Sequence, residues 1–495
     1  RRAASRPRAM VGLQELAGLL VASLAVAAKA QVLQLPLQRL QSQPLPQEGV
    51  LLAEEGLQAV DFRSLSSPQE ARISTAAVGE GASPLADAVA APLGDVVVGV
   101  ARLRASAQPV ELAAEPMPAW LAEVGALRRA RLRNQHNMIY VIDARVGTPP
   151  VSVRLIVDTG SSDLWVKRQS DGGAAGGLWY SVNESSSASA LPQGRVLLQY
   201  GQGEISGLEV RDRICLDGLC VSNQSFVLAE LVKDLGGGSL FDGLLGLAYP
   251  ALAVDRSGGT FLQELEAHGH FGRLAFGLSL GPFGAAGRGS SLAFGSVEDL
   301  ERAARASGLG PGYDLRLWGF NSEAFYWMVQ ASVSVAAASA DAPDFSCTAL
   351  TTLDSGTSLL VAPQPVFSEV LGSLFPTPRE RSSLLQAPDG SFVCPCDARL
   401  GSLAFRFASR DGRELNITLT SEDLLEYLGT LSTGQRLCRV GLMPGPSNIP
   451  MWILGDIFLR RVYAVHDFEG HSVVLYPQPA ASPGARPRGR AARPS

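Results

Sequence analysis

The 495-residue sequence predicts an all-β protein made of two related lobes. From residue 134 onward, short segments rich in β-branched and aromatic residues alternate with Gly, Pro, Asn and Asp, as in a series of strands and turns. One motif occurs twice, around Asp158 and again around Asp354. Two apolar residues and a glycine follow each copy at similar distances, ending at Gly246, 88 residues after Asp158, and at Gly455, 101 residues after Asp354. We therefore expect two lobes related by a pseudo-twofold axis.

The first 30 residues are expected to be a signal peptide. Four arginines within residues 1–8 precede an uncharged run over 16–28, and Ala-Lys-Ala at 28–30 fits a small-x-small cleavage pattern. The run has thirteen residues, whereas a bilayer span needs about 20. A membrane anchor and a buried helix are the alternatives, but neither accounts for both the basic start and the Ala-x-Ala end.

Residues 31–133 are interpreted as a prosegment. This stretch is rich in Ala, Pro, Gln and Ser up to about residue 117. Over 118–133, Leu121, Val124 and Leu127 recur at helical spacing and basic residues gather at the end, where the helix dipole favours them, so we expect a helix there. A processing boundary is expected to follow it, although the arginines are nearly as well explained as a solvated face.

The rest of the chain divides into an N-terminal β lobe, 134–312, a C-terminal β lobe, 313–477, and a flexible basic tail, 478–495. Strands are expected in the first lobe over 138–146, 151–157, 195–200 and 206–215.

Charge and hydropathy exclude several functions. The 42 basic and 47 acidic residues leave a net charge of −5, so no overall basic field attracts nucleic acid. No segment after residue 30 is long and apolar enough to span a membrane, and we expect a soluble monomer. Only three lysines are present, Lys29, Lys167 and Lys233.

Six cysteines in a chain with a signal peptide indicate three disulfides. They are Cys215, Cys220, Cys347, Cys394, Cys396 and Cys438. The first two bracket a turn and are expected to form a hairpin bridge, whereas the other pairings stay open. The five histidines lie near no cysteine pair with zinc-ligand spacing, so we expect no metal. Asn183, Asn223 and Asn416 each begin a glycosylation sequon.

The repeated motif is suited to acid–base chemistry. An aspartate after a buried strand is costly to ionise unless N–H and hydroxyl groups compensate, and the neighbouring Gly and Ser/Thr residues supply them. If two copies meet on a pseudo-twofold axis, both carboxylates cannot easily stay charged, so one holds a proton and the other is a base. Such a pair can activate water against a carbonyl. A single Asp-Thr/Ser-Gly would more simply be a turn, but the duplication favours an active site.

Taken together, these features resemble the pepsin-like aspartic endopeptidases from residue 134 to 477. The matching pieces, in order, occupy residues 146–150, 158–166, 200–201, 241–250, 325–327, 354–358 and 452–459. The resemblance implies a bilobal pepsin-like acid protease fold, with a central cleft and a sheet shared between the lobes. It also implies an endopeptidase that needs no cofactor, prefers bulky hydrophobic residues flanking the scissile bond, and is made as a latent proenzyme.

The same resemblance assigns roles residue by residue. It makes Asp158 and Asp354 the catalytic dyad, supported by a set of loop residues and faced by a flap and cleft. The supporting residues are Thr159, Gly160, Ser161, Ser355, Gly356 and Thr357. The flap and cleft residues are Tyr200, Gly201, Gln202, Trp165 and Ser358, with Trp165 as the indole partner of the flap tyrosine.

Latency is the point at which this sequence departs from the family. Residues 32–40 resemble the first inhibitory strand of the family's prosegments, which often cover the aspartates with a lysine. No lysine lies between Gln31 and Arg133, so we hypothesise that an arginine within 128–133 blocks the dyad, or that the prosegment inhibits differently. The resemblance places the protein in the secretory pathway, either secreted or in an acidic, lysosome-like compartment. The alternative function is a catalytically silent, peptide-binding homologue.

Overall fold

The structure is a computed structural model. It describes residues 51–52, 58–59 and 127–478, except for 136, 169–179, 201–202, 234, 236–239, 255–257, 269–270, 272, 283–288, 320–323, 337–344, 388–389 and 432. The expected signal peptide, most of the prosegment and nearly all of the tail lie outside these residues. No helix in the described part is long and apolar enough to cross a membrane.

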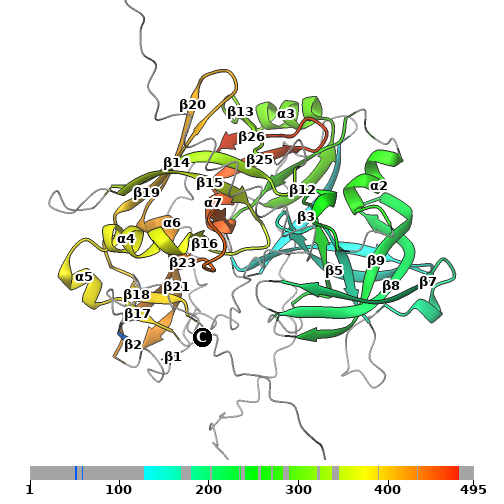
Figure 1. Cartoon of the computed structure of the whole chain (residues 1–495), viewed down its shortest axis with the longest axis horizontal. Coiled ribbons are helices and arrows are strands. Elements are labelled where there is room, and N and C mark those ends of the chain that lie inside the picture. The colour runs from blue at the N-terminus through cyan, green and yellow to red at the C-terminus, as the bar shows by residue number, and fades with distance from the viewer. Residues whose placement is uncertain are drawn as a thin grey trace, which may run out of the picture.

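Strands dominate the described residues and form three sheets (Figure 1). The largest runs, in spatial order, through β13 (Tyr313–Arg316), β26 (Ser472–Pro477), β25 (Val462–Asp467), β11 (Ala275–Ser279), β12 (Ser290–Gly295), β3 (Arg128–Gln135), β4 (Ile139–Val146), β5 (Val151–Asp158), β10 (Gly243–Gly246), β6 (Leu164–Lys167), β9 (Leu219–Lys233), β8 (Glu204–Leu216) and β7 (Ser189–Gln199).

Two further sheets are built mainly from the C-terminal half, and the second of them also includes two short strands from residues 51–59. One contains β20 (Glu414–Leu419), β19 (Ser402–Ala408), β14 (Met328–Ala336), β15 (Phe345–Leu353), β24 (Trp452–Leu454), β16 (Leu360–Ala362) and β23 (Leu442–Pro444). The other contains β1 (Leu51–Leu52), β21 (Leu425–Leu431), β22 (Arg436–Val440), β18 (Phe392–Pro395), β17 (Leu385–Gln386) and β2 (Gln58–Ala59).

Short helices connect the strands. They are η3 (Val182–Glu184), η4 (Pro250–Leu252), α2 (Phe261–Ala267), α3 (Val297–Ala306), α4 (Gln364–Leu374), α5 (Pro378–Ser382), α6 (Ser421–Leu424) and α7 (Asp456–Leu459). The all-β prediction is confirmed, and the four expected strands of the first lobe correspond to β4, β5, β7 and β8.

The largest sheet joins the two halves of the chain. β25 and β26 come from the end of the sequence, yet β25 pairs antiparallel with β11 of the first half, with His466 opposite Phe276. Figure 1 shows β25 and β26 at the upper centre of the molecule, between β14 of the C-terminal half and β12 of the first half. The tryptophans Trp165, Trp327 and Trp452 are fully buried, so both halves have an aromatic core.

The helix expected over 118–133 is wrong where the structure describes it, because residues 128–135 form strand β3. Ala130 and Leu132 are buried, whereas the intervening Arg131 is partly exposed. This strand pairs with β12 on one side and β4 on the other, so two hydrogen-bonded neighbours outweigh the local helical pattern.

The prediction of three disulfides is also wrong for this structure. Cys215 pairs with Cys220, as expected for the hairpin, and Cys396 pairs with Cys438. Cys347 and Cys394 are free thiols. Cys347 lies on β15 and Cys394 on β18, strands of two different sheets. Asn183, Asn223 and Asn416 are all exposed, so glycosylation there stays a prediction.

Candidate active site

The duplicated motif lies at the ends of two equivalent strands. β5 ends at Asp158, and β15 ends one residue before Asp354. A parallel strand flanks each of them, β10 beside β5 and β24 beside β15, with Gly246 opposite Asp158. These flanking strands are the apolar-apolar-glycine segments of the sequence, so the predicted internal repeat is confirmed in three dimensions.

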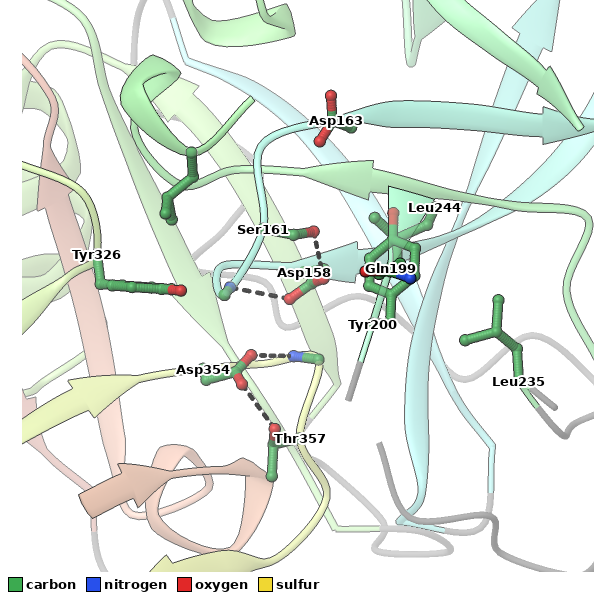
Figure 2. Close-up of a pocket in the computed structure, with 13 residues that line it drawn as sticks. Asp158, Ser161, Asp163, Gln199, Tyr200, Leu235, Leu244, Tyr326, Asp354 and Thr357 are labelled. Atoms are coloured by element: carbon green, nitrogen blue, oxygen red, sulfur yellow. Dashed lines mark hydrogen bonds between the residues drawn. The ribbon is translucent and has the colours of Figure 1, made fainter. Parts of the chain in front are cut away.

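Each aspartate is held by two donors from its own loop (Figure 2). Asp158 accepts hydrogen bonds from the Gly160 N–H at 2.8 Å and from the Ser161 hydroxyl at 2.5 Å. Asp354 accepts them from the Gly356 N–H at 2.8 Å and from the Thr357 hydroxyl at 2.6 Å. Both carboxylates therefore have fixed orientations before any substrate binds.

Thr159 and Ser355 bond across the lobes. The Thr159 hydroxyl donates to the Leu353 carbonyl at 3.0 Å and accepts from the Ser355 N–H at 2.9 Å. The Ser355 hydroxyl reciprocates, donating to the Val157 carbonyl at 2.9 Å and accepting from the Thr159 N–H at 3.1 Å. Four bonds thus lock the two loops together around the pseudo-twofold axis.

This locking brings the carboxylates close together. A Cβ atom on Gly356 would lie 2.2 Å from Asp158 Oδ1, so only glycine fits between the loops. Burial, followed by the repulsion of Asp158, raises the pKa of Asp354 well above its ordinary value. A proton is therefore retained between the two aspartates at pH values where an isolated carboxyl group would lose it.

A cleft of about 650 Å³, including space open to solvent, extends from the two aspartates. Tyr200 of the expected flap lines it, and Figure 2 shows Tyr326 on the other side. Three leucines supply an apolar wall, namely Leu235, Leu244 and Leu252. Burial raises the pKa of Tyr326, as do Asp354 and Asp158 to a smaller extent, so its hydroxyl stays protonated.

Two residues expected in the cleft lie elsewhere. Trp165 is fully buried behind the cleft, and its indole N–H has no hydrogen-bond partner among the described residues, so the expected bond to Tyr200 is absent. The Ser358 hydroxyl donates to the Met138 carbonyl and does not line the cleft. Gly201 and Gln202 lie outside the described residues.

Several cleft residues were not predicted from the sequence. Tyr326 lies within the matching piece 325–327, and Leu244 lies within the repeated apolar-apolar-glycine segment, so both carried a signal. Asp163 likewise lies within the matching piece 158–166, whereas Gln199, Leu235 and Leu252 carried no signal beyond that of their neighbours. Asp163 adds a third carboxylate to the lining, but both its oxygens accept the Val254 N–H, at 3.1 and 3.2 Å.

The hypothesis that an arginine within 128–133 covers the aspartates is not supported. Arg133 bonds to Asp143, and neither it nor Arg131 lines the cleft, because β3 holds both in the shared sheet. Within the described ranges, no three His, Cys, Asp or Glu side chains are grouped so as to hold a metal ion.

Comparison with known proteins gives one family. Residues 139–477 match the model of the "Eukaryotic aspartyl protease" family. Gastricsin of Mus musculus is 29% identical over 348 residues, which are 68% of this chain and 80% of that protein. Cathepsin E of Mus musculus is 28% identical over 70% of this chain and 82% of its own length. Pregnancy-associated glycoprotein 2 of Bos taurus is 27% identical over 70% of this chain and 84% of its own length.

Proposed function

Because the chain belongs to the eukaryotic aspartyl protease family, we propose that it is an active endopeptidase that hydrolyses peptide bonds with Asp158 and Asp354. The observation that supports this most directly is the pair itself. Each carboxylate is held by an N–H and a hydroxyl group, and the two loops are bonded to each other. A catalytically silent, peptide-binding homologue would have no need of two intact and equivalent loops.

The chemistry uses one proton and one water molecule. The ionised carboxylate takes a proton from water, and the hydroxide oxygen bonds to the carbonyl carbon of the substrate. The protonated carboxyl gives its proton to the carbonyl oxygen, producing a neutral tetrahedral diol. The first carboxyl then protonates the amide nitrogen while the second takes back the diol proton, the C–N bond breaks, and the amine and acid leave. The dyad finishes with the single proton it had at the start.

Cleavage of casein or haemoglobin at pH 4, with and without a statine-type inhibitor, tests this proposal. An active enzyme digests the protein and is blocked by the inhibitor. A silent homologue cleaves nothing, although it can still bind the inhibitor. Absence of cleavage would therefore favour the peptide-binding homologue over the active enzyme.

The apolar wall supports a preference for bulky hydrophobic residues beside the scissile bond. Leu244 and Leu245 are neighbours on β10, but only Leu244 lines the cleft, whereas Leu245 faces the main core. We expect Leu244→Ala to lower kcat/KM for a leucine-containing peptide about tenfold, because a shortened pocket wall loses about 1–3 kcal/mol of contact. For a peptide that carries the larger phenylalanine in place of leucine, kcat/KM should fall less.

Leu245→Ala is the matched control for this prediction. It should lower thermal stability through the core cavity it leaves, while the ratio of kcat/KM for leucine and phenylalanine peptides stays at the wild-type value. If this ratio is also unchanged in Leu244→Ala, Leu244 does not form part of the specificity pocket.

We also propose a secreted precursor, with a signal peptide over 1–30 and a prosegment that begins at residue 31. For the activation cleavage site, we propose a position upstream of the one expected from the sequence. A cut after residue 133 would divide β3, although Leu132 is paired with Ser290 on one side and Ile142 on the other. The proposal is therefore that β3 stays in the mature enzyme.

N-terminal sequencing of the acid-treated full chain tests this boundary. The mature chain should begin at or before residue 128, because cleavage within β3 requires the central strand of the shared sheet to leave both neighbours. A mature chain beginning at Asn134 would contradict it and restore the boundary expected from the sequence.

A further inference from the structure

The loop that carries Asp354 is held from two sides, outside its own hydrogen bonds. On one side, the Asp456 N–H at the start of α7 donates to the Thr357 carbonyl at 2.8 Å. This approach is close, since a Cβ atom on Gly455 would lie 2.2 Å from that carbonyl. On the other side, the Ser358 hydroxyl donates to the carbonyl of Met138, which belongs to the first half of the chain.

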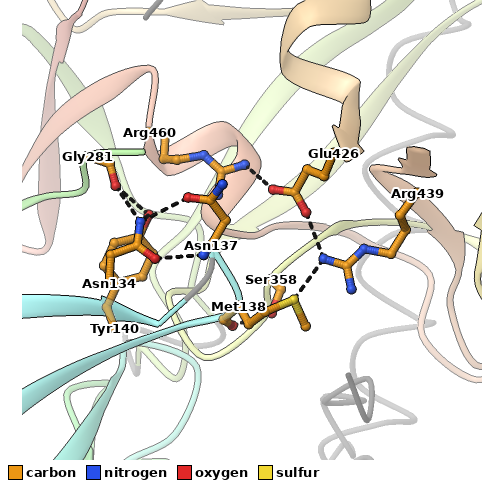
Figure 3. Close-up of polar contacts among 9 residues, drawn as sticks. All are labelled: Asn134, Asn137, Met138, Tyr140, Gly281, Ser358, Glu426, Arg439 and Arg460. Carbon is orange, nitrogen blue, oxygen red and sulfur yellow. Dashed lines mark hydrogen bonds and ion pairs between the residues drawn. The ribbon is translucent and has the colours of Figure 1, made fainter. Parts of the chain in front are cut away.

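The two supports are joined behind the loop by one carboxylate (Figure 3). Arg460, at the far end of α7, donates to Glu426 Oε1 at 2.7 Å. Arg439 donates to Glu426 Oε2, also at 2.7 Å, and contacts the Met138 sulfur at 2.9 Å. The contacts therefore form a closed ring with two arms. One arm runs from the Asp354 loop through α7 and Arg460 to Glu426. The other runs from Glu426 through Arg439 and Met138 back to the loop.

This ring, which we name the Glu426 ring, is buried. The side chains of Arg439, Glu426 and Arg460 are 5%, 10% and 11% exposed. Asp456 and Tyr140 are the other titratable groups that face Arg460, and burial raises the pKa of Tyr140, which keeps it neutral. With little water nearby, Glu426 supplies a charged hydrogen bond to each of the two arginines.

Met138 is itself held in place. Asn137, the residue before it, has a positive φ of 58°, and its N–H donates to Asn134 Oδ1 at 2.7 Å. The Asn134 amide in turn donates to the Gly281 carbonyl at 2.8 Å, as Figure 3 shows. The turn that carries the Met138 carbonyl is therefore fixed by these bonds, and Arg439 contacts the same residue through its sulfur.

Among the residues that the structure describes, the equivalent loop around Asp158 has no such ring. Ser162 occupies the place of Ser358 in the motif, and its hydroxyl donates to the Tyr249 carbonyl at 2.6 Å. The Ala248 N–H donates to the Ser161 carbonyl at 2.9 Å. These supports are neutral and come from the same lobe, so the two halves of the active site are held by different means.

We propose that Glu426 is a positioning residue for Asp354, acting through the two arms of the Glu426 ring. This inference rests on the proposed function, because it assigns a role in the same reaction. Glu426→Gln keeps the shape of the side chain but offers one amide oxygen and one N–H₂ group to two guanidinium groups. One arm is then released, and the Asp354 loop loses the support of that arm while it keeps its bonds to the Asp158 loop.

The test compares Glu426→Gln with Glu230→Gln in the full chain after acid activation. Glu230 also binds two arginines, Arg168 at 2.7 Å and Arg195 at 2.8 Å, but on the surface of β9. With active sites counted by titration with a statine-type inhibitor, kcat in Glu426→Gln should fall about ten- to a hundredfold while KM stays within about twofold, since small displacements of a catalytic group act on turnover. Glu230→Gln should match the wild type in both constants.

Hydrogen exchange supplies a readout that does not depend on turnover. Peptides covering residues 354–359 should exchange faster in Glu426→Gln and at the wild-type rate in Glu230→Gln. If Glu426→Gln fails to fold, Arg439→Lys, which keeps the charge but loses the planar fork, should show the same changes at smaller size.

The outcomes separate the two proposals. Unchanged kcat per active site and unchanged exchange in Glu426→Gln, with only a lower melting temperature, would overturn the positioning role. If the wild type cleaves nothing but hydrogen exchange over residues 354–359 is still faster in Glu426→Gln, the proposed function is wrong. The conclusion that Glu426 positions the Asp354 loop would then still stand.

Discussion

Replacing Asp158 or Asp354 by asparagine should lower turnover at least about a thousandfold, because an amide cannot pass a proton between water, carbonyl oxygen and leaving amine. Each asparagine can accept the loop N–H with its amide oxygen and donate its N–H₂ group to the loop hydroxyl, so the fold should be retained. Hydrolysis of a peptide substrate at pH 4, with circular dichroism of the same samples, measures both effects.

Asp163→Asn is the control for this pair of variants. Asp163 lines the same cleft, and its carboxylate accepts the Val254 N–H, which an amide oxygen can also do. Its turnover should stay within about tenfold of the wild type, on the scale of a group outside the proton transfers. Full activity in either dyad variant would end the proposed mechanism.

The Asp354 variant should also change how stability depends on pH. The folded-state pKa of Asp354 is raised, mainly by burial, so the native state holds this proton more tightly than the unfolded chain. That contribution to stability is complete below the ordinary pKa of 3.8 and is lost as the pH rises through the raised value. Asp354→Asn has no such proton to lose, so its stability relative to the wild type should increase from pH 4 to pH 7.

His466→Phe should stabilise the protein in acid by about 3 kcal/mol more than it does at pH 7. His466 is fully buried on β25, stacked on Phe276 with 4.4 Å between ring centroids and edge-on to Trp327. Burial lowers its pKa from 6.5 to about 3. At pH 4 the unfolded chain takes up this proton and the native state does not, which costs about 3 kcal/mol at 1.36 kcal/mol per pH unit.

The sign follows from the lowered pKa. The stabilisation that neutral His466 provides is complete above pH 6.5 and is lost as the pH falls towards 3. Phenylalanine keeps the stacking and takes up no proton. Urea unfolding at pH 4 and pH 7 gives the difference, with the exposed His268→Gln as the control. Equal effects of His466→Phe at both pH values would show that this histidine is not neutral in the native state.

The parts of the site predicted from the sequence are those with a local signal. The Asp158 and Asp354 loops and their flanking strands repeat one short pattern, so the residues and their pairing were predictable. Strand β3 was not, because its residues suit a helix and only pairing with β12 and β4 makes them a strand. The Glu426 ring was not predictable either. Its charged members are single residues scattered over the chain, and they meet only because the fold brings α7, β21 and β22 together.

The pairing of β25 with β11 has a consequence for how the protein is made. β11 spans Ala275–Ser279, whereas its partner spans Val462–Asp467, nearly two hundred residues later. The first lobe therefore leaves the ribosome with an unpaired strand edge and keeps it until β25 has been synthesised. Until β25 covers it, this edge can pair with a strand of another chain.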